Sequence, residues 1–143
     1  MRFEQIQKRL SAMPEVAAWA DLRDLVSRTA SRRSTPVWEY PLLACRAVGG
    51  EEEAALPAAA AIYCSLLSIH LVDDLLDEDP RGAYRRLGAG AAANLALALQ
   101  AAGHRLLDEA PAPAETRAEL IVAETARGAG SALAERLHRE GMI

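Results

Sequence analysis

The feature that most constrains the fold is a run of nineteen residues without a charged side chain, from Ala54 to Val72, which leads directly into five acidic residues. About 20 apolar residues in a helix are enough to cross the hydrocarbon core of a membrane. This run, however, contains Pro57, Ser68 and His70, and polar groups are costly inside a bilayer. We therefore predict a helix buried in a protein core and not a transmembrane segment.

The amino-acid composition favours helices along the whole chain. Its 143 residues include 31 Ala and 20 Leu but only six Val, five Ile and four Thr, and aromatic residues make up 4%. Ala and Leu are strong helix formers, whereas a sheet needs the residue types that are scarce here. The length fits one domain, residues 1–143. We predict an all-α fold, a bundle of five or so helices.

Proline and glycine residues mark the expected helix boundaries. We expect helices at about 14–30, from Pro36 or Pro41 to Gly49, from about Pro57 to Asp79, at 91–109 and at about 114–139, with a loop at 80–90. The helix at 91–109 carries Ala or Leu on nearly every side, so all its sides need cover. It is either central in the bundle or covered by a second copy, a partner subunit or further sequence.

Charge and cysteine usage narrow the class of protein. The net charge of −4 does not suggest a nucleic-acid partner. Cys45 and Cys64 lack the spacing of zinc ligands or of a redox motif, and are expected to be reduced thiols. Residues 1–20 contain no apolar run of the kind that a signal peptide has. We expect a cytoplasmic protein.

Five of the 20 acidic residues fall within 73–79, at the end of the expected buried helix. Carboxylates near a helix C-terminus oppose the helix dipole, at a cost of roughly 0.3–1 kcal/mol each. Asp73 and Asp77 are one helical turn apart on one face, and Asp74 follows Asp73 directly, so we expect the three carboxylates to converge. Oxygen ligands without a cage of Cys or His suit Mg²⁺. The alternative is a solvated helix end paired with arginines.

Three arginines, Arg81, Arg85 and Arg86, follow the acidic residues in a segment that also contains Gly82 and Gly88. Guanidinium groups bind phosphate oxygens in a bidentate manner, and accessible backbone N–H groups add to this binding. Carboxylates that hold Mg²⁺, followed by arginines, predict a site for a diphosphate.

The segment Asp73-Asp74-Leu75-Leu76-Asp77 resembles the first aspartate-rich motif, DDxxD, of the trans-isoprenyl diphosphate synthases, the polyprenyl synthetase family. The run Tyr40-Pro41-Leu42-Leu43, the Gly49-Gly50 pair and the helix at 91–109 resemble the family's sequence around that motif. The resemblance covers about residues 35–110. It implies a bundle of the isoprenoid synthase type, of which this chain would form the N-terminal half.

The resemblance implies a Mg²⁺-dependent prenyltransferase that acts on an allylic isoprenoid diphosphate. In such enzymes Mg²⁺ bridges the first aspartates to the diphosphate, whose C–O bond ionises, and isopentenyl diphosphate attacks the allylic cation. Asp73, Asp74 and Asp77 match the metal-binding, catalytic carboxylates. The residues that would contact the substrate, as diphosphate ligands or as walls of the product pocket, are Arg81, Arg85, Arg86, Ser68 and Ile69. For Ser68 and Ile69, the alternative to a role in the product pocket is ordinary packing between helices.

The sequence also departs from the family at the site for isopentenyl diphosphate. The family's Gly-Lys-x-x-Arg segment is replaced by Pro36, Val37 and Tyr40, and its His or Gln seven positions before the motif is Leu66. No second aspartate-rich motif is present, since Asp108-Glu109 is the only acidic pair after Arg81. We therefore expect that these residues alone do not turn over substrate.

Three functions stay open at this point. The first is an enzyme of which this chain is one half, acting on an allylic diphosphate by elongation, by cyclisation as class I terpene cyclases do, or by hydrolysis. The second is a non-catalytic relative that binds a prenyl diphosphate, or that pairs with a copy of itself or with a catalytic subunit through the helix at 91–109. The third is a helical bundle whose acidic helix end binds no metal.

Overall fold

The computed structural model describes residues 2–28, 37–116, 118–119, 122 and 139–141, and every regular element in these ranges is a helix. The predicted all-α class is confirmed. The chain divides into two units, Met1–Pro111 and Ala112–Ile143. In the second unit residues 114–116, 118–119, 122 and 139 are helical, and the rest of the predicted helix at 114–139 lies outside the described residues. All the elements below belong to the first unit.

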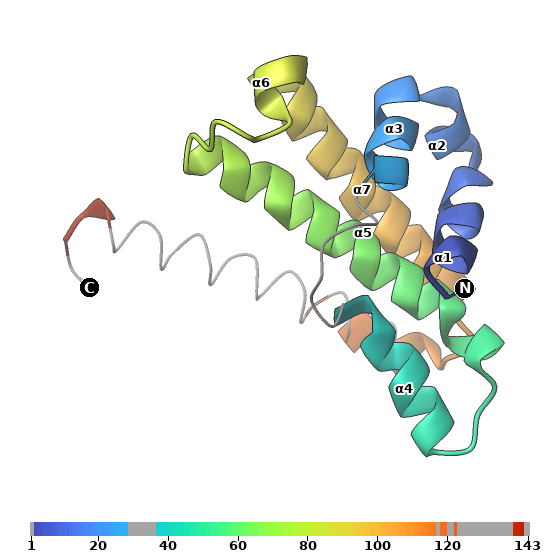
Figure 1. Ribbon diagram of the computed structural model, residues 1–143. Coiled ribbons are helices and arrows are strands. Elements are labelled where there is room, and N and C mark those ends of the chain that lie inside the picture. The colour runs from blue at the N-terminus through green and yellow to red at the C-terminus, as the bar shows by residue number, and fades with distance from the viewer. Residues whose placement is uncertain (1, 29–36, 117, 120–121, 123–138, 142–143) are drawn as a thin grey trace. The chain divides into compact units, whose positions relative to one another are not determined.

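The core of the first unit is a pair of long helices, α5 (Glu52–Leu76) and α7 (Ala89–Glu109), which lie side by side (Figure 1). Ser68 contacts Ala96, and Gly103 lies against Ala61, so the two helices are antiparallel. A Cβ atom added to Gly103 would lie 3.3 Å from the carbonyl oxygen of Ala61. Small side chains at this contact therefore allow the two backbones to approach closely.

Helix α5 contains the uncharged run, and it begins at Glu52, five residues before Pro57. It is the one helix in the described ranges that is long and apolar enough to cross a membrane, with a mean hydropathy of 1.8 over an 18-residue window. Of that window, 56% is buried inside the fold. Core helices pass the same test of length and composition, and the burial of α5 against α7 accounts for its apolar sequence.

Three N-terminal helices, α1 (Arg2–Ser11), α2 (Pro14–Ala18) and α3 (Ala20–Arg28), pack beside this pair (Figure 1). The buried apolar side chains of these helices and of the link between α1 and α2 are Ile6, Leu10, Met13, Val16, Leu22 and Val26. The hydroxyl of Tyr63 on α5 donates a hydrogen bond of 3.4 Å to the Val26 carbonyl. The Tyr63 ring also meets the Phe3 ring edge to face, with centroids 5.2 Å apart. Helix α1 was not among the helices expected from the sequence.

The prediction of one continuous helix at 14–30 is wrong, because the chain breaks at Trp19. Trp19 has an extended backbone, with φ −109° and ψ 106°, between α2 and α3. The guanidinium of Arg23 donates to the carbonyl of Ala17 at 3.2 Å, which satisfies a carbonyl that the break exposes. Pro14 does begin α2, as its fixed φ favours. Residues 29–30 of the expected helix lie outside the described residues.

Helix α4 (Tyr40–Ala47) follows a 3₁₀ turn at Val37–Glu39 and has Pro41 in its first turn. It ends just before Gly49, whose φ of 81° belongs to the left-handed region that favours glycine. The Gly50 N–H donates to the Cys45 carbonyl at 2.8 Å. The predicted start at Pro41 and stop at the glycine pair are therefore confirmed, whereas the alternative start at Pro36 falls outside the described residues.

The predicted loop at 80–90 contains a one-turn helix, α6 (Tyr84–Leu87), before Gly88 leads into α7. The predicted helix at 91–109 is confirmed as α7. Its face toward α5 is buried and includes Leu95, Leu99 and Leu106. Its outer face is not covered within the described residues, and Leu97 there is 69% exposed. Burial on all sides, as the sequence suggested, is thus not found in this unit.

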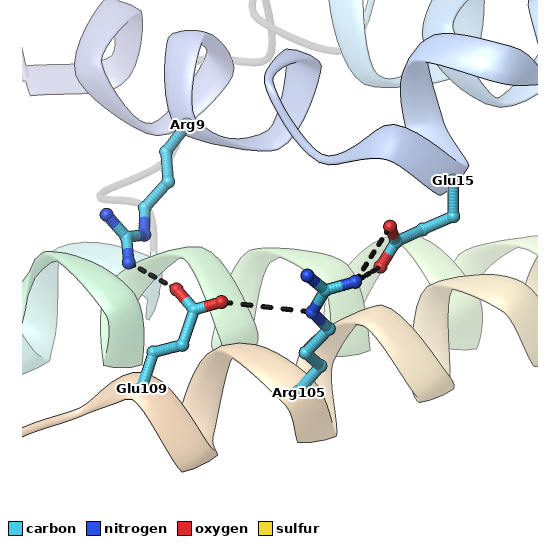
Figure 2. A network of polar contacts seen from close by, with 4 residues as sticks. All are labelled: Arg9, Glu15, Arg105 and Glu109. Atoms are coloured by element: carbon cyan, nitrogen blue, oxygen red, sulfur yellow. Dashed lines mark hydrogen bonds and ion pairs between the residues drawn. The ribbon is translucent and has the colours of Figure 1, made fainter.

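Four charged side chains tie α1 and α2 to the C-terminal end of α7 (Figure 2). Arg105 on α7 donates from Nη1 to both carboxylate oxygens of Glu15 on α2, at 2.9 and 3.0 Å. Arg9 on α1 binds Glu109 on α7, and Nε of Arg105 lies 3.9 Å from the same carboxylate. Arginine and glutamate alternate along the row, so each charge faces an opposite one.

Candidate functional site

The DDxxD segment forms the last turn of α5, residues 73–76, and its C-cap, Asp77. The helix ends at Leu76, and Glu78 adopts a left-handed φ of 53°. The Asp79 N–H then donates to the Asp74 carbonyl at 3.0 Å, which is the hydrogen bond of a Schellman cap. This cap holds the acidic helix end in place and directs the chain into the arginine-bearing segment.

Two of the three predicted metal ligands are presented together at this end. Asp73 and Asp77 are exposed and one helical turn apart, and the Asp77 N–H donates to the Asp73 carbonyl at 2.8 Å. In the described part of the chain no side chain is hydrogen-bonded or ion-paired to either carboxylate. The pair is therefore available to an external cation.

Asp74 faces a different neighbour from the other two aspartates. It is half-buried, and a Cβ atom added to Gly82 would lie 2.9 Å from the Cβ of Asp74. Its side chain thus starts beside the returning loop. Across the described residues, no three His, Cys, Asp or Glu side chains are grouped so that they could hold a metal ion. The expected convergence of all three carboxylates is not found, because consecutive helix positions differ by about 100°.

Arg81 is held by Asp79 and not by the DDxxD carboxylates. Its Nε and Nη2 atoms donate to the two Asp79 oxygens at 3.1 and 2.9 Å, and its backbone N–H donates to the same carboxylate at 2.8 Å. The hydrogen bonds and charge of Asp79, and then the charge of Asp74, raise the pKa of Arg81 above its usual value. Two of its five guanidinium N–H donors are therefore already in use.

Arg85 and Arg86 on α6 are exposed. The guanidinium carbon of Arg85 lies 5.2 Å from the centre of the Tyr84 ring, a cation–π contact. Tyr84 packs closely on Gly82, where an added Cβ would lie 2.7 Å from the ring. The absence of a side chain at Gly82 therefore lets Tyr84 approach the acidic end of α5. Arg85 and Arg86 are accessible to solvent.

Ser68 and Ile69, predicted to line a product pocket, lie one to two turns before the aspartates. Ser68 is buried, and its hydroxyl donates to the Ala96 carbonyl on α7 at 2.9 Å. Ile69 is half-buried. Within the first unit Ser68 therefore belongs to the contact between α5 and α7, in line with the packing alternative, and only Ile69 retains free surface.

Two features of this unit could not be predicted from the sequence. The hydroxyl of Tyr84 is buried and has no hydrogen-bond partner in the described part of the chain. The row of Arg9, Glu15, Arg105 and Glu109 joins residues 90 to 100 positions apart. Contacts between exposed charges at such separations follow from the docking of α1 and α2 on α7, which helical periodicity alone does not predict.

Comparisons with protein-family models, with curated proteins and with solved structures found no match for this chain. The likeness to polyprenyl synthetases stays a prediction from the residues quoted above.

Proposed function

We propose that this chain binds an allylic isoprenoid diphosphate through Mg²⁺ at the acidic end of α5, as a protein of the polyprenyl synthetase type. The observation that carries the proposal is the pair Asp73 and Asp77. These carboxylates are one turn apart, exposed and unpaired among the described residues, at the end of an otherwise apolar helix. Without a bound cation this arrangement opposes the helix dipole and costs stability.

The donor set fits Mg²⁺ as proteins usually bind it. Mg²⁺ keeps several waters and is commonly held by one or two carboxylates together with substrate phosphates, so a cage of three protein ligands is not needed. Asp73 and Asp77 would supply the protein ligands, and Asp74 would contribute its charge from the loop side. When bound, the metal would neutralise charge on the diphosphate and help it to leave.

The three arginines after the motif are expected to have different roles in binding the diphosphate. Arg85 and Arg86 are exposed and would donate to phosphate oxygens, whereas Arg81 would mainly hold Asp79 and the loop. The Arg85→Gln/Arg86→Gln double variant should weaken the binding of farnesyl diphosphate, measured by titration calorimetry with MgCl₂, by at least about tenfold. Arg28→Gln, another exposed arginine, is the matched control and should bind as the wild type does. Equal binding by all three proteins would reject the arginine assignment.

Activity is a separate question from binding. Only the first aspartate motif is present and the segment for isopentenyl diphosphate is altered, so we expect binding without turnover by these residues alone. Diphosphate release from geranyl, farnesyl or geranylgeranyl diphosphate measures turnover directly. Release that depends on isopentenyl diphosphate would indicate a prenyltransferase, whereas release without it would indicate cyclisation or hydrolysis.

A second candidate function is pairing with another subunit through α7. Leu97 favours it, since this side chain is 69% exposed on the outer face of the helix, with exposed Ala93 and Ala101 one turn to either side. The partner would be a second copy or a catalytic subunit. Leu97→Asp should lower the sedimentation coefficient of a self-associated protein to that of a monomer. Ala18→Asp, an exposed alanine on α2, should not.

A further inference from the structure

A groove of about 430 Å³ lies where α1 and α2 meet the N-terminal part of α5 and the C-terminal end of α7. Sites for small molecules commonly occupy about 300–1,000 Å³. Its apolar lining includes Met13, Leu56 and Leu106. Leu106 is fully buried and Met13 is 6% exposed, so these two side chains lie beneath the groove, and the half-buried Leu56 contributes to its apolar surface.

The polar lining of the groove is mostly cationic. Lys8, Arg9 and Arg105 line it together with a single carboxylate, Glu109. Counting also Glu15, which holds Arg105 from outside the lining, one positive charge remains in excess. Lys8 carries this excess charge, because it is exposed and makes no ion pair within the described residues, whereas Arg9 and Arg105 are paired with glutamates. A local positive excess stands out in a chain whose net charge is −4.

Arg9 adds a donor that lacks an acceptor. Its Nη2 atom binds Glu109, while its Nε atom is buried and has no hydrogen-bond partner in the described part of the chain. Buried polar groups in native proteins are almost always hydrogen-bonded. Figure 2 shows the Arg9 guanidinium reaching from α1 toward Glu109 on α7. Arg9 is one of the residues that line the groove.

We propose that this groove binds a small organic monocarboxylate with an apolar body. The apolar side chains would take the body, and the excess positive charge at Lys8, next to the guanidinium of Arg9, would take the carboxylate. The site is separate from the acidic end of α5. Leu56 and Asp73 are seventeen residues apart on that helix, or about 25 Å along its axis. Its ligand is therefore independent of any diphosphate bound at Asp73 and Asp77.

The test uses octanoate as the probe and backbone amide chemical shifts as the readout. Octanoate should produce saturable shifts at groove residues such as Gln5, Ala12 and Leu106. Octylammonium, with the same chain and the opposite charge, should bind at least about fivefold more weakly, because the groove holds excess positive charge. Equal binding of the two probes, or octanoate shifts centred on residues 73–86, would overturn the proposal.

Two variants locate the site. Ala12 is exposed and lines the groove, so Ala12→Trp should fill the groove and abolish octanoate binding. Ala18 is also exposed but does not line the groove, so Ala18→Trp should not affect binding. Lys8→Gln should weaken octanoate binding about two- to fivefold, as the loss of one exposed charge does. Unchanged binding by Lys8→Gln would contradict the charge argument even if Ala12→Trp did not fold.

Discussion

The hydroxyl of Ser68 on α5 donates a 2.9 Å hydrogen bond to the carbonyl oxygen of Ala96 on α7, and this contact is buried between the two helices. Helix carbonyls are already paired within their own helix, so this hydroxyl adds a second hydrogen bond across the interface. The polar residue in the middle of an apolar helix therefore fixes how α5 and α7 lie against each other.

Replacement of Ser68 should lower stability through this contact. Ser68→Ala removes the donor and leaves the Ala96 carbonyl with its intrahelical partner, so the free energy of unfolding should fall by about 1 kcal/mol. Urea denaturation followed by circular dichroism measures the change. Ser27→Ala, which removes an exposed hydroxyl bonded within its own helix, is the control and should change the free energy far less. A Ser68→Ala variant as stable as the wild type would show that the interhelical bond contributes nothing.

The two glycines of α7 at positions 90 and 103 should respond in opposite ways to larger residues. Gly103→Leu places a side chain against the backbone of Ala61 and should destabilise the fold by about 1–3 kcal/mol. An added Cβ at Gly90 meets nothing within 4 Å, so Gly90→Ala should stabilise the helix by about 0.5–1 kcal/mol. Thermal unfolding of both variants gives the comparison. A rise in the midpoint for Gly103→Leu would show that the helices do not approach closely there.

The left-handed backbone of Glu78 should make glycine the more stable residue at that position. The φ of 53° costs a side-chain-bearing residue about 1 kcal/mol, and glycine avoids this cost. Glu78→Gly should therefore raise the free energy of unfolding relative to Glu78→Ala, which removes the same carboxylate and keeps the Cβ atom. If the two variants were equally stable, the cap at the acidic end of α5 would not have the conformation described.

Burial of Cys64 should make the stability fall at alkaline pH. Burial raises the pKa of its thiol from 9.0 to about 12. The unfolded chain therefore loses this proton near pH 9 while the folded chain keeps it, so the contribution is complete below pH 9 and is lost between pH 9 and 12. The loss attributable to this thiol should be of the order of 2 kcal/mol by pH 11.

The Cys64→Ala variant isolates this effect. Urea denaturation at pH 8 and pH 11 should show a smaller fall in stability for the variant than for the wild type. Cys45→Ala is the matched control, since Cys45 is only half-buried and its removal should leave the pH dependence as it was. Parallel falls in all three proteins would mean that the thiol of Cys64 does not stay protonated in the folded state.

Much of the fold could be predicted from residue type and spacing. The helices at 52–76 and 89–109 follow from long Ala- and Leu-rich runs between proline and glycine, and Gly49 marks the end of α4. The break at Trp19 could not be predicted, because its neighbours are good helix formers and the break depends on how α2 and α3 pack on the rest of the chain.

The candidate site was predicted less completely. Helical spacing correctly placed Asp73 and Asp77 on one face, since both lie on or directly after the last turn of α5. The same spacing places Asp74 about 100° around the helix from Asp73, whereas its contact with Gly82 and the pairing of Arg81 depend on the turn that follows the helix. Both contacts follow from the cap at Glu78. Its left-handed backbone could not be predicted, because the sequence has no glycine at that position.

The measurement that tests the proposed function most directly is the Mg²⁺ dependence of farnesyl diphosphate binding by the wild type and by Asp73→Asn/Asp77→Asn. We expect the wild type to bind in MgCl₂ and to lose binding in EDTA. The variant should bind at least about tenfold more weakly in MgCl₂, because its amide groups carry no charge for the metal. Asp24→Asn, a half-buried aspartate on α3 that pairs with Arg28, should bind as the wild type does. Binding that is independent of Mg²⁺, or equal in the wild type and the double variant, would contradict a metal-bridged diphosphate site at the end of α5.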